Sequence, residues 1–193
     1  MSEHLSQAFW AEMSACEHFV QIYEADDVFM DTLTGFIAGA LRQGEGAIVI
    51  ATPAHRDELR WRLELDGFDV SAAKQNDQLL LLDADDTISK FIVNGWPDED
   101  KFVQIVRDIL ARAGRDGRRV RAFGEMVALM WAKGYCAATV RLEHLWHQLC
   151  QQESFSLFCA YPKSGFTENP ADSIARVCAE HSKVFPAEPA KSV

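Results

Sequence analysis

The feature that most constrains the fold is an uninterrupted apolar run of strand length, Ala47-Ile48-Val49-Ile50-Ala51. A strand with one wet face alternates apolar and polar residues, whereas a strand of a parallel sheet has helices on both faces and is continuously apolar. The run therefore predicts a strand that is covered on both sides.

Strand-like and helix-like segments alternate along the rest of the chain. Further strands are expected at 18–23, 79–82, 120–123 and 155–161, and apolar residues at helical spacing predict helices at about 27–43, 53–66, 99–113, 138–149 and 170–185. The stretch 94–97 is expected to be a loop. This alternation favours right-handed βαβ units. The expected fold class is α/β, with three layers and a mostly parallel sheet of five or more strands that has helices on both faces.

Length and composition fit one ordinary globular domain. The chain has 193 residues, of which 48% are hydrophobic and 25% charged. We expect an N-terminal helix or arm at 1–16, the α/β domain at 17–185 and a flexible Pro- and Ala-rich tail at 186–193.

The formal net charge of -10 argues against anionic partners. Its field repels phosphate backbones and anionic membranes unless a basic patch intervenes. The one such patch, Arg115, Arg118, Arg119 and Arg121, is short and is interpreted as a solvated turn between a helix and a strand. We expect no direct nucleic-acid binding and no membrane contact, because the longest apolar runs are also too short to span a bilayer.

The five cysteines are odd in number and irregularly spaced, without a CxxC pair. A reducing cytoplasm is the simplest compartment for such a chain.

In open parallel sheets, ligands bind beyond the carboxyl ends of the strands. The expected topology therefore nominates the polar residues that follow each strand as ligand-binding candidates. They are Tyr23, Glu24, Thr52, His55, Asp83, Glu125 and Tyr161.

Glu125 is the most informative of these candidates because Gly124 allows a sharp turn and Met126, Leu129 and Met130 follow as an apolar wall. Its carboxylate is equally suited to accepting a ligand hydrogen bond or acting as a base, and to capping a helix N-terminus. For Asp83, helix capping near Asp85 and Asp86 is favoured over ligand contact.

His144, His147 and Cys150 lie at successive i, i+3 spacings, so that neighbouring side chains could share a metal. Three ligands on one helix drift around its surface, and a closed site would need Cys178 or His181 as well. Core packing and surface placement are favoured, and no metal or other cofactor is expected.

Sequence motifs of catalysis are missing. The chain has no GxSxG, HExxH or GxGxxG motif and no GxxxxGK[ST] phosphate loop. Where such a loop would lie, the chain runs into Tyr23-Glu24-Ala25-Asp26-Asp27, whose carboxylates repel a triphosphate. We expect a protein that is not an enzyme.

The chain resembles the MEDS family, the sensory domain of methanogens, methylotrophs and a dichloromethane-responsive regulator. The segments that carry the resemblance are 18–24, 44–45, 51–55, 81–84, 123–126, 142–146 and 159–162, within about 16–185. The resemblance implies a RecA- and KaiC-like fold without the phosphate loop, and sensing of small hydrocarbon derivatives. Members are commonly joined to histidine kinase, anti-sigma-type or DNA-binding modules. Here the module is missing, so the chain is either a stand-alone sensor with a separate partner or a piece of a longer protein.

The leading hypothesis is thus a non-catalytic sensory domain that binds a small molecule and regulates a signalling partner. One alternative is a nucleotide-binding or nucleotide-hydrolysing enzyme with an atypical phosphate site, in which Glu125 activates water. A second alternative, compatible with the first hypothesis, is a homo-oligomeric interaction module, such as a homodimer formed through the N-terminal arm.

Overall fold

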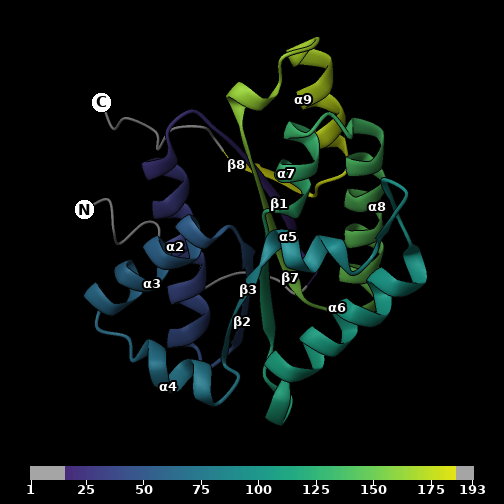
Figure 1. The fold of residues 1–193 in the computed structure, drawn as a ribbon. Coiled ribbons are helices and arrows are strands. Elements are labelled where there is room, and N and C mark those ends of the chain that lie inside the picture. Colours follow the sequence, from purple (N-terminus) through teal and green to yellow (C-terminus); the bar gives the residue numbers. More distant parts are fainter. Residues whose placement is uncertain (1–15, 186–193) are drawn as a thin grey trace.

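The computed structural model describes residues 16–185, which form three layers (Figure 1). Residues 1–15 of the arm predicted at 1–16 and the tail at 186–193 lie outside the described residues. The strands of the main sheet are β1 (His18–Tyr23), β2 (Gly46–Ala51), β3 (Leu79–Asp83), β6 (Val120–Gly124), β7 (Ser156–Pro162) and β8 (Lys183–Phe185). Their order is β3-β2-β6-β7-β1-β8, and every neighbouring pair is parallel. The predicted α/β class and parallel sheet are confirmed.

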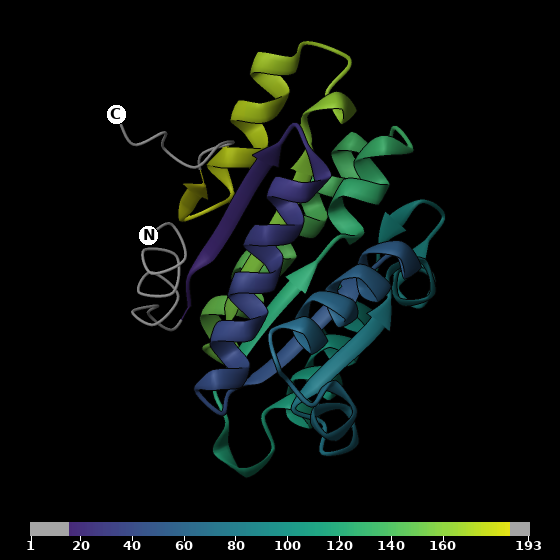
Figure 2. The same cartoon turned by 90° about the vertical axis from the view of Figure 1, so that its left-hand side faces the viewer.

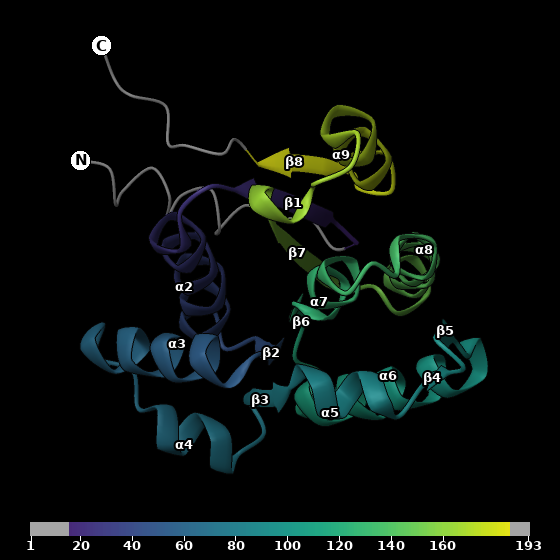
Figure 3. The ribbon, with the colours of Figure 1, turned by 45° about the horizontal axis from the view of Figure 1, so that its top comes forward.

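Helices cover both faces of the sheet (Figure 3). One face carries α2 (Asp26–Arg42), α3 (Pro53–Leu65) and α4 (Val70–Gln75). The opposite face carries α5 (Ala84–Ser89), α6 (Glu99–Ala113), α7 (Met126–Ala132), α8 (Cys136–Glu153) and α9 (Pro170–Ala179). Short 3-10 turns occupy Arg115–Gly117 and Lys163–Gly165. We call these two sides the α2–α4 face and the α5–α9 face.

The apolar run of β2 is buried on both sides, as predicted. Ile48 and Ile50 belong to the core beneath the α5–α9 face, whereas Ala47, Val49 and Ala51 belong to the core beneath the α2–α4 face. Successive side chains of a strand point to opposite faces, so a strand between two helical layers needs apolar residues at every position.

Several local predictions need correction. The last helix does not continue to Phe185: it ends at Ala179, and β8 follows, pairing with β1 at the sheet edge (Figure 2). The stretch 94–97 is not a plain loop, because β4 (Ile92–Val93) and β5 (Trp96–Pro97) form a small antiparallel hairpin. Its turn residues, Asn94 and Gly95, both have positive φ, as tight hairpin turns require.

The basic patch was interpreted as a solvated turn, which is wrong for one of its residues. Arg121 lies within β6 and is 3% exposed, and its Nε donates to Oε2 of Glu45 at 2.6 Å. The strand predicted at 120–123 includes Arg121, but its charge led to the wrong expectation that the side chain is exposed. A buried guanidinium is tolerated where a carboxylate pairs with it.

None of the helices within residues 16–185 is both long enough and apolar enough to cross a membrane. None of the five cysteines forms a disulfide bond.

Candidate functional site

The sheet has a topological switch point between its neighbouring strands β2 and β6. The chain leaves β2 toward α3 on the α2–α4 face and leaves β6 toward α7 on the α5–α9 face. The two connections diverge there, and ligands of open α/β sheets bind in such crevices. Thr52 and His55 follow β2, and Glu125 follows β6, so this point brings together three of the predicted residues.

Glu125 joins the two strand ends. Its Oε2 accepts a hydrogen bond from the backbone N–H of Thr52 at 2.8 Å, and its Oε1 lies 2.9 Å from Nδ1 of His55. Its own N–H donates to the carbonyl of Ile50 at 2.8 Å, which fixes the turn after Gly124. Both carboxylate oxygens therefore have partners.

The position of Glu125 agrees with the capping interpretation of this residue, although at a helix other than the one that follows it. The side chain makes no capping bond to α7, the helix that follows it. It lies instead at the N-terminus of α3, where Thr52 is the N-cap residue and the first turn holds no acidic residue of its own. A carboxylate is stabilised at that end of a helix dipole.

His55 lies at the rim of this arrangement, with 19% of its side chain exposed. Its hydrogen bond to Glu125 raises its pKa above the usual value, with further attraction from the charges of Glu125 and Asp26 opposing the effect of partial burial. One edge of the imidazole contacts the ring of Phe29 at 5.1 Å between centroids. The imidazolium form is thus favoured at a half-buried position.

Tyr23, the fourth predicted residue, lies on the same face. Its ring stacks on Phe29 at 4.8 Å between centroids. Burial, followed by the charges of Asp26 and Glu125, raises the pKa of the phenol, which therefore stays protonated. Sequence reasoning missed Phe29 as part of the site, because its helical spacing indicated only a core position.

The other three predicted residues lie elsewhere. Glu24 pairs with Lys163 on the exposed surface at 2.5 Å. Asp83 accepts from Nη2 of Arg56 at 2.8 Å and from the N–H of Asp86 at 3.0 Å, which makes it the N-cap of α5, as the favoured alternative predicted. Tyr161 lies beneath the α5–α9 face, where its hydroxyl donates to Oε1 of Glu143 at 2.5 Å.

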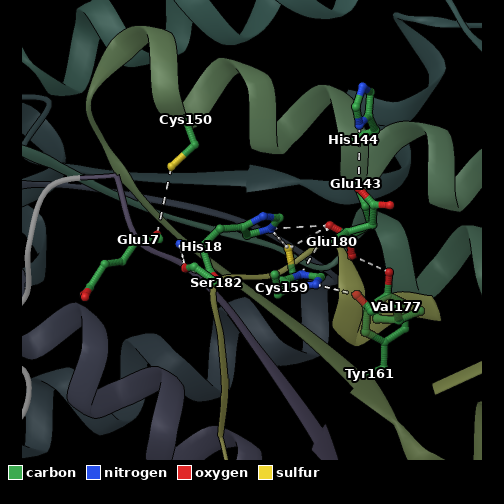
Figure 4. Close-up of polar contacts among 11 residues, drawn as sticks. Glu17, His18, Glu143, His144, Cys150, Cys159, Tyr161, Val177, Glu180 and Ser182 are labelled. Atoms are coloured by element: carbon green, nitrogen blue, oxygen red, sulfur yellow. Dashed lines mark hydrogen bonds and ion pairs between the residues drawn. The ribbon is translucent and has the colours of Figure 1, made fainter. Parts of the chain in front are cut away.

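A buried polar cluster lies around Glu143, next to Tyr161, and the sequence analysis did not predict it (Figure 4). It consists of His18, Glu143, Cys159 and His181, whose side chains offer nitrogen, oxygen and sulfur atoms within 4.8 Å of one another. We call it the His-Glu-Cys-His cluster. No spacing motif indicates it, because its members come from β1, α8, β7 and the segment after α9.

The three residues considered for a metal at the sequence level do not converge. His144 is exposed and lies 3.6 Å from Glu180, whereas Sγ of Cys150 donates to the carbonyl of Phe155 at 2.8 Å. His147 contacts Gln151 at 3.0 Å. Of the two additional ligands considered, His181 joins the buried cluster.

A surface groove lies between α6 and α8, apart from both the switch point and the buried polar cluster. Most of its lining side chains, which come from the segments 99–108 and 145–152, are charged or carry amides.

The fold and the half-buried polar contacts at its switch point define a class: parallel α/β domains with polar residues gathered at the carboxyl edge of the sheet. Within that class, the family model "MEthanogen/methylotroph, DcmR Sensory domain" matches residues 17–182, and the chain belongs to this MEDS family. Comparison with curated proteins finds no match. A sensory or signalling role follows from the family, while the relation to RecA and KaiC stays a prediction.

Proposed function

We propose that the chain is a non-catalytic sensory domain that binds a small molecule at the β2–β6 switch point and thereby regulates a signalling protein partner. The observation that carries the proposal is the convergence of Thr52, His55 and Glu125 from two divergent connections at one half-buried point. Binding there would change the relative position of α3 and the end of β6, and so shift the population of two conformations.

The chemistry of the site favours a ligand that carries an oxygen function. His55 uses Nδ1 for Glu125, so Nε2 remains to contact a carbonyl, hydroxyl or carboxylate. Glu125 already lies at the N-terminus of α3, so the imidazole is the polar group that a ligand would meet. Phe29 and Tyr23 are themselves buried and support the imidazole from within the core. An oxygenated hydrocarbon derivative is compatible with this site and agrees with the sensing that the family resemblance implies.

A non-catalytic role is supported by how Glu125 is held. A general base needs a carboxylate oxygen directed at substrate or water. Both oxygens of Glu125 are already engaged, one by a backbone N–H and the other by an imidazole. The enzyme alternative, in which Glu125 activates water, is thus less well supported than binding.

The test is a titration of the isotopically labelled full chain with short alcohols, aldehydes, carboxylates and halogenated hydrocarbons, followed by amide NMR. We expect one of these classes to shift the amide signals near Thr52, His55 and Glu125. His55→Gln should weaken that binding about tenfold to a hundredfold, since a lost charged hydrogen bond contributes about 1.5–3 kcal/mol. His144→Gln, an exposed histidine outside the site, is the matched control and should bind normally.

Two outcomes would count against the proposal. Shifts confined to other surfaces, or shifts at the switch point that His55→Gln leaves unchanged, would remove the site. Hydrolysis of a nucleotide that Glu125→Gln abolishes would favour the enzyme alternative instead. Partner regulation needs a separate measurement, in which the affinity of a co-purified signalling protein is compared with and without the ligand.

A further inference from the structure

The His-Glu-Cys-His cluster lies between the sheet and α8, on the face of the sheet opposite α3. His18 starts β1, Cys159 lies in β7, Glu143 projects from α8, and His181 follows α9. The side chains of His18, Glu143 and His181 are at most 1% exposed, and Cys159 is fully buried. Figure 4 shows the side chains of His18, Cys159 and Glu143 pointing toward one another.

Four distances connect these side chains, and the two between Glu143 and the histidines are long for hydrogen bonds. Oε2 of Glu143 lies 3.5 Å from Nε2 of His18 and 3.5 Å from Nε2 of His181. Sγ of Cys159 lies within hydrogen-bond range of Oε2 of Glu143, at 3.6 Å, and of Nε2 of His18, at 3.5 Å. A tetrahedral ion with bonds of about 2.0–2.3 Å to nitrogen, oxygen and sulfur separates neighbouring ligand atoms by roughly 3.3–3.6 Å. These four distances match that separation.

His181 is oriented as a metal-binding histidine would be. Its Nδ1 lies 2.7 Å from the carbonyl of Val177 and can only donate to it, so Nε2 is the unprotonated nitrogen of the neutral ring. That Nε2 is buried without a hydrogen-bond partner among the described residues and faces a carboxylate oxygen. Two lone pairs then face each other in a dry site, which is costly unless a cation lies between them.

Neighbouring groups hold the remaining ligands. Tyr161 donates to Oε1 of Glu143 and leaves Oε2 directed at the cluster. Ser182 ties the two histidine-bearing segments together, because its Oγ accepts from the N–H of His18 at 2.9 Å and donates to the carbonyl of His18 at 2.8 Å. Such supporting hydrogen bonds to ligands are typical of metal sites.

A divalent ion would also balance the charge of the cluster. The carboxylate of Glu143 is buried, and its Oε2 lies 3.6 Å from the sulfur of Cys159. A divalent ion would displace the thiol proton to solvent and meet one thiolate, one carboxylate and two neutral imidazoles. The two negative ligands then balance the ion.

We propose that His18, Glu143, Cys159 and His181 form a closed, four-coordinate structural site for a divalent transition-metal ion, with Zn²⁺ as the ion that this mixed N, O and S set fits best. The site fastens β1, β7, α8 and the α9–β8 segment to one another. It leaves no coordination position to solvent, which distinguishes a structural site from a catalytic one.

The first test uses the unmodified full chain. We expect elemental analysis of protein purified without chelator to find one Zn²⁺ per chain. After chelation under reducing conditions, added Co²⁺ should give the visible bands of tetrahedral coordination and the near-ultraviolet band of thiolate ligation. Metal-free preparations that take up no Co²⁺, and whose thermal unfolding is unchanged by Zn²⁺, would overturn the proposal and leave a hydrogen-bonded polar cluster.

Variants identify the ligands. Cys159→Ser should lose the thiolate band, while Cys136→Ser, which changes an exposed cysteine, should keep it. Tyr161→Phe removes only the supporting hydroxyl and should weaken metal affinity about tenfold to a hundredfold. It serves as the second variant if Cys159→Ser does not fold. A thiolate band that survives in Cys159→Ser and is lost in Cys136→Ser would place the metal elsewhere.

Discussion

Nδ1 of His55 lies 2.9 Å from Oε1 of Glu125, so that the first turn of α3 is joined to the end of β6, 70 residues further along the chain. The same carboxylate accepts the N–H of Thr52. This contact links helices on opposite faces of the sheet at the point where their connections diverge, and it makes several properties of the chain testable.

Removal of the Glu125 carboxylate should destabilise the fold. Glu125→Ala leaves the Thr52 N–H and the His55 imidazole without their acceptor, and an unsatisfied buried polar group costs about 1–3 kcal/mol. Urea unfolding of the two proteins measures the difference. Glu24→Ala is the control, since Glu24 forms an exposed ion pair with Lys163 and its removal should change stability much less. Equal losses in both variants would contradict the assigned role of Glu125.

The pair of His55 and Glu125 should also make the stability of the fold depend on pH. The folded-state pKa of His55 is raised by its hydrogen bond to Glu125, with Asp26 as a further negative neighbour. The folded state therefore binds the proton more tightly than the unfolded state does, and the stabilisation is fully present below the unfolded pKa of about 6.5. It is lost as pH rises through the higher folded pKa. The difference in the free energy of unfolding between wild type and His55→Gln should therefore shrink as pH rises. A difference that grows with pH would contradict a stabilising pair of His55 and Glu125.

The buried pair of Arg121 and Glu45 should be strongly coupled. Arg121 is 3% and Glu45 6% exposed, and the Nε–Oε2 distance is 2.6 Å. Either single substitution, Arg121→Met or Glu45→Gln, breaks a buried ion pair and should cost about 3–5 kcal/mol. The loss should be smaller for Arg121→Met, because Arg119 also lies 3.7 Å from the Glu45 carboxylate. The double variant should cost clearly less than the two losses combined, because neither charge is then left unpaired. A double-mutant cycle in urea measures this coupling, and additive losses would disprove it.

Gly46 should not tolerate a side chain. A Cβ built at Gly46 would lie 2.3 Å from the carbonyl oxygen of Ala113, where α6 ends against the start of β2. Relieving this overlap requires a backbone shift, so Gly46→Ala should lower stability by about 1–3 kcal/mol or more. Gly165→Ala is the control, because its Cβ would meet only Pro162 at an ordinary 3.8 Å. Thermal unfolding of both variants decides the question.

The sequence alone predicted most of the strands because their apolar runs are local signals. The strand predicted at 18–23 is confirmed without change, and the run at 47–51 differs by one residue at its start. The edge strand β8 escaped prediction, since Lys183–Phe185 is only three residues long and, within residues 16–185, pairs with β1 alone. Its pairing is a property of the assembled sheet, not of its residues.

The candidate site was predicted in part for a related reason. Strand order places the ends of β2 and β6 side by side and so brings Thr52, His55 and Glu125 together. Their role in ligand binding stays a prediction. The rule that ligands bind at the carboxyl edge of the sheet nominated both Tyr23 and Tyr161, but their side chains lie on opposite faces of the sheet. The register pairs Ile22 with Tyr161, so Tyr23 is one residue further on and points the other way.

The sequence by itself determined the α/β class, the doubly covered strand and the edge of the sheet that gathers polar residues, because periodicity and strand ends are local properties of a chain. Only the tertiary structure decided that Glu125 bridges two connections, that Arg121 is buried against Glu45, and that His18, Glu143, Cys159 and His181 meet beneath α8. Those contacts join residues up to 163 positions apart, and they depend on strand order, register and side-chain direction.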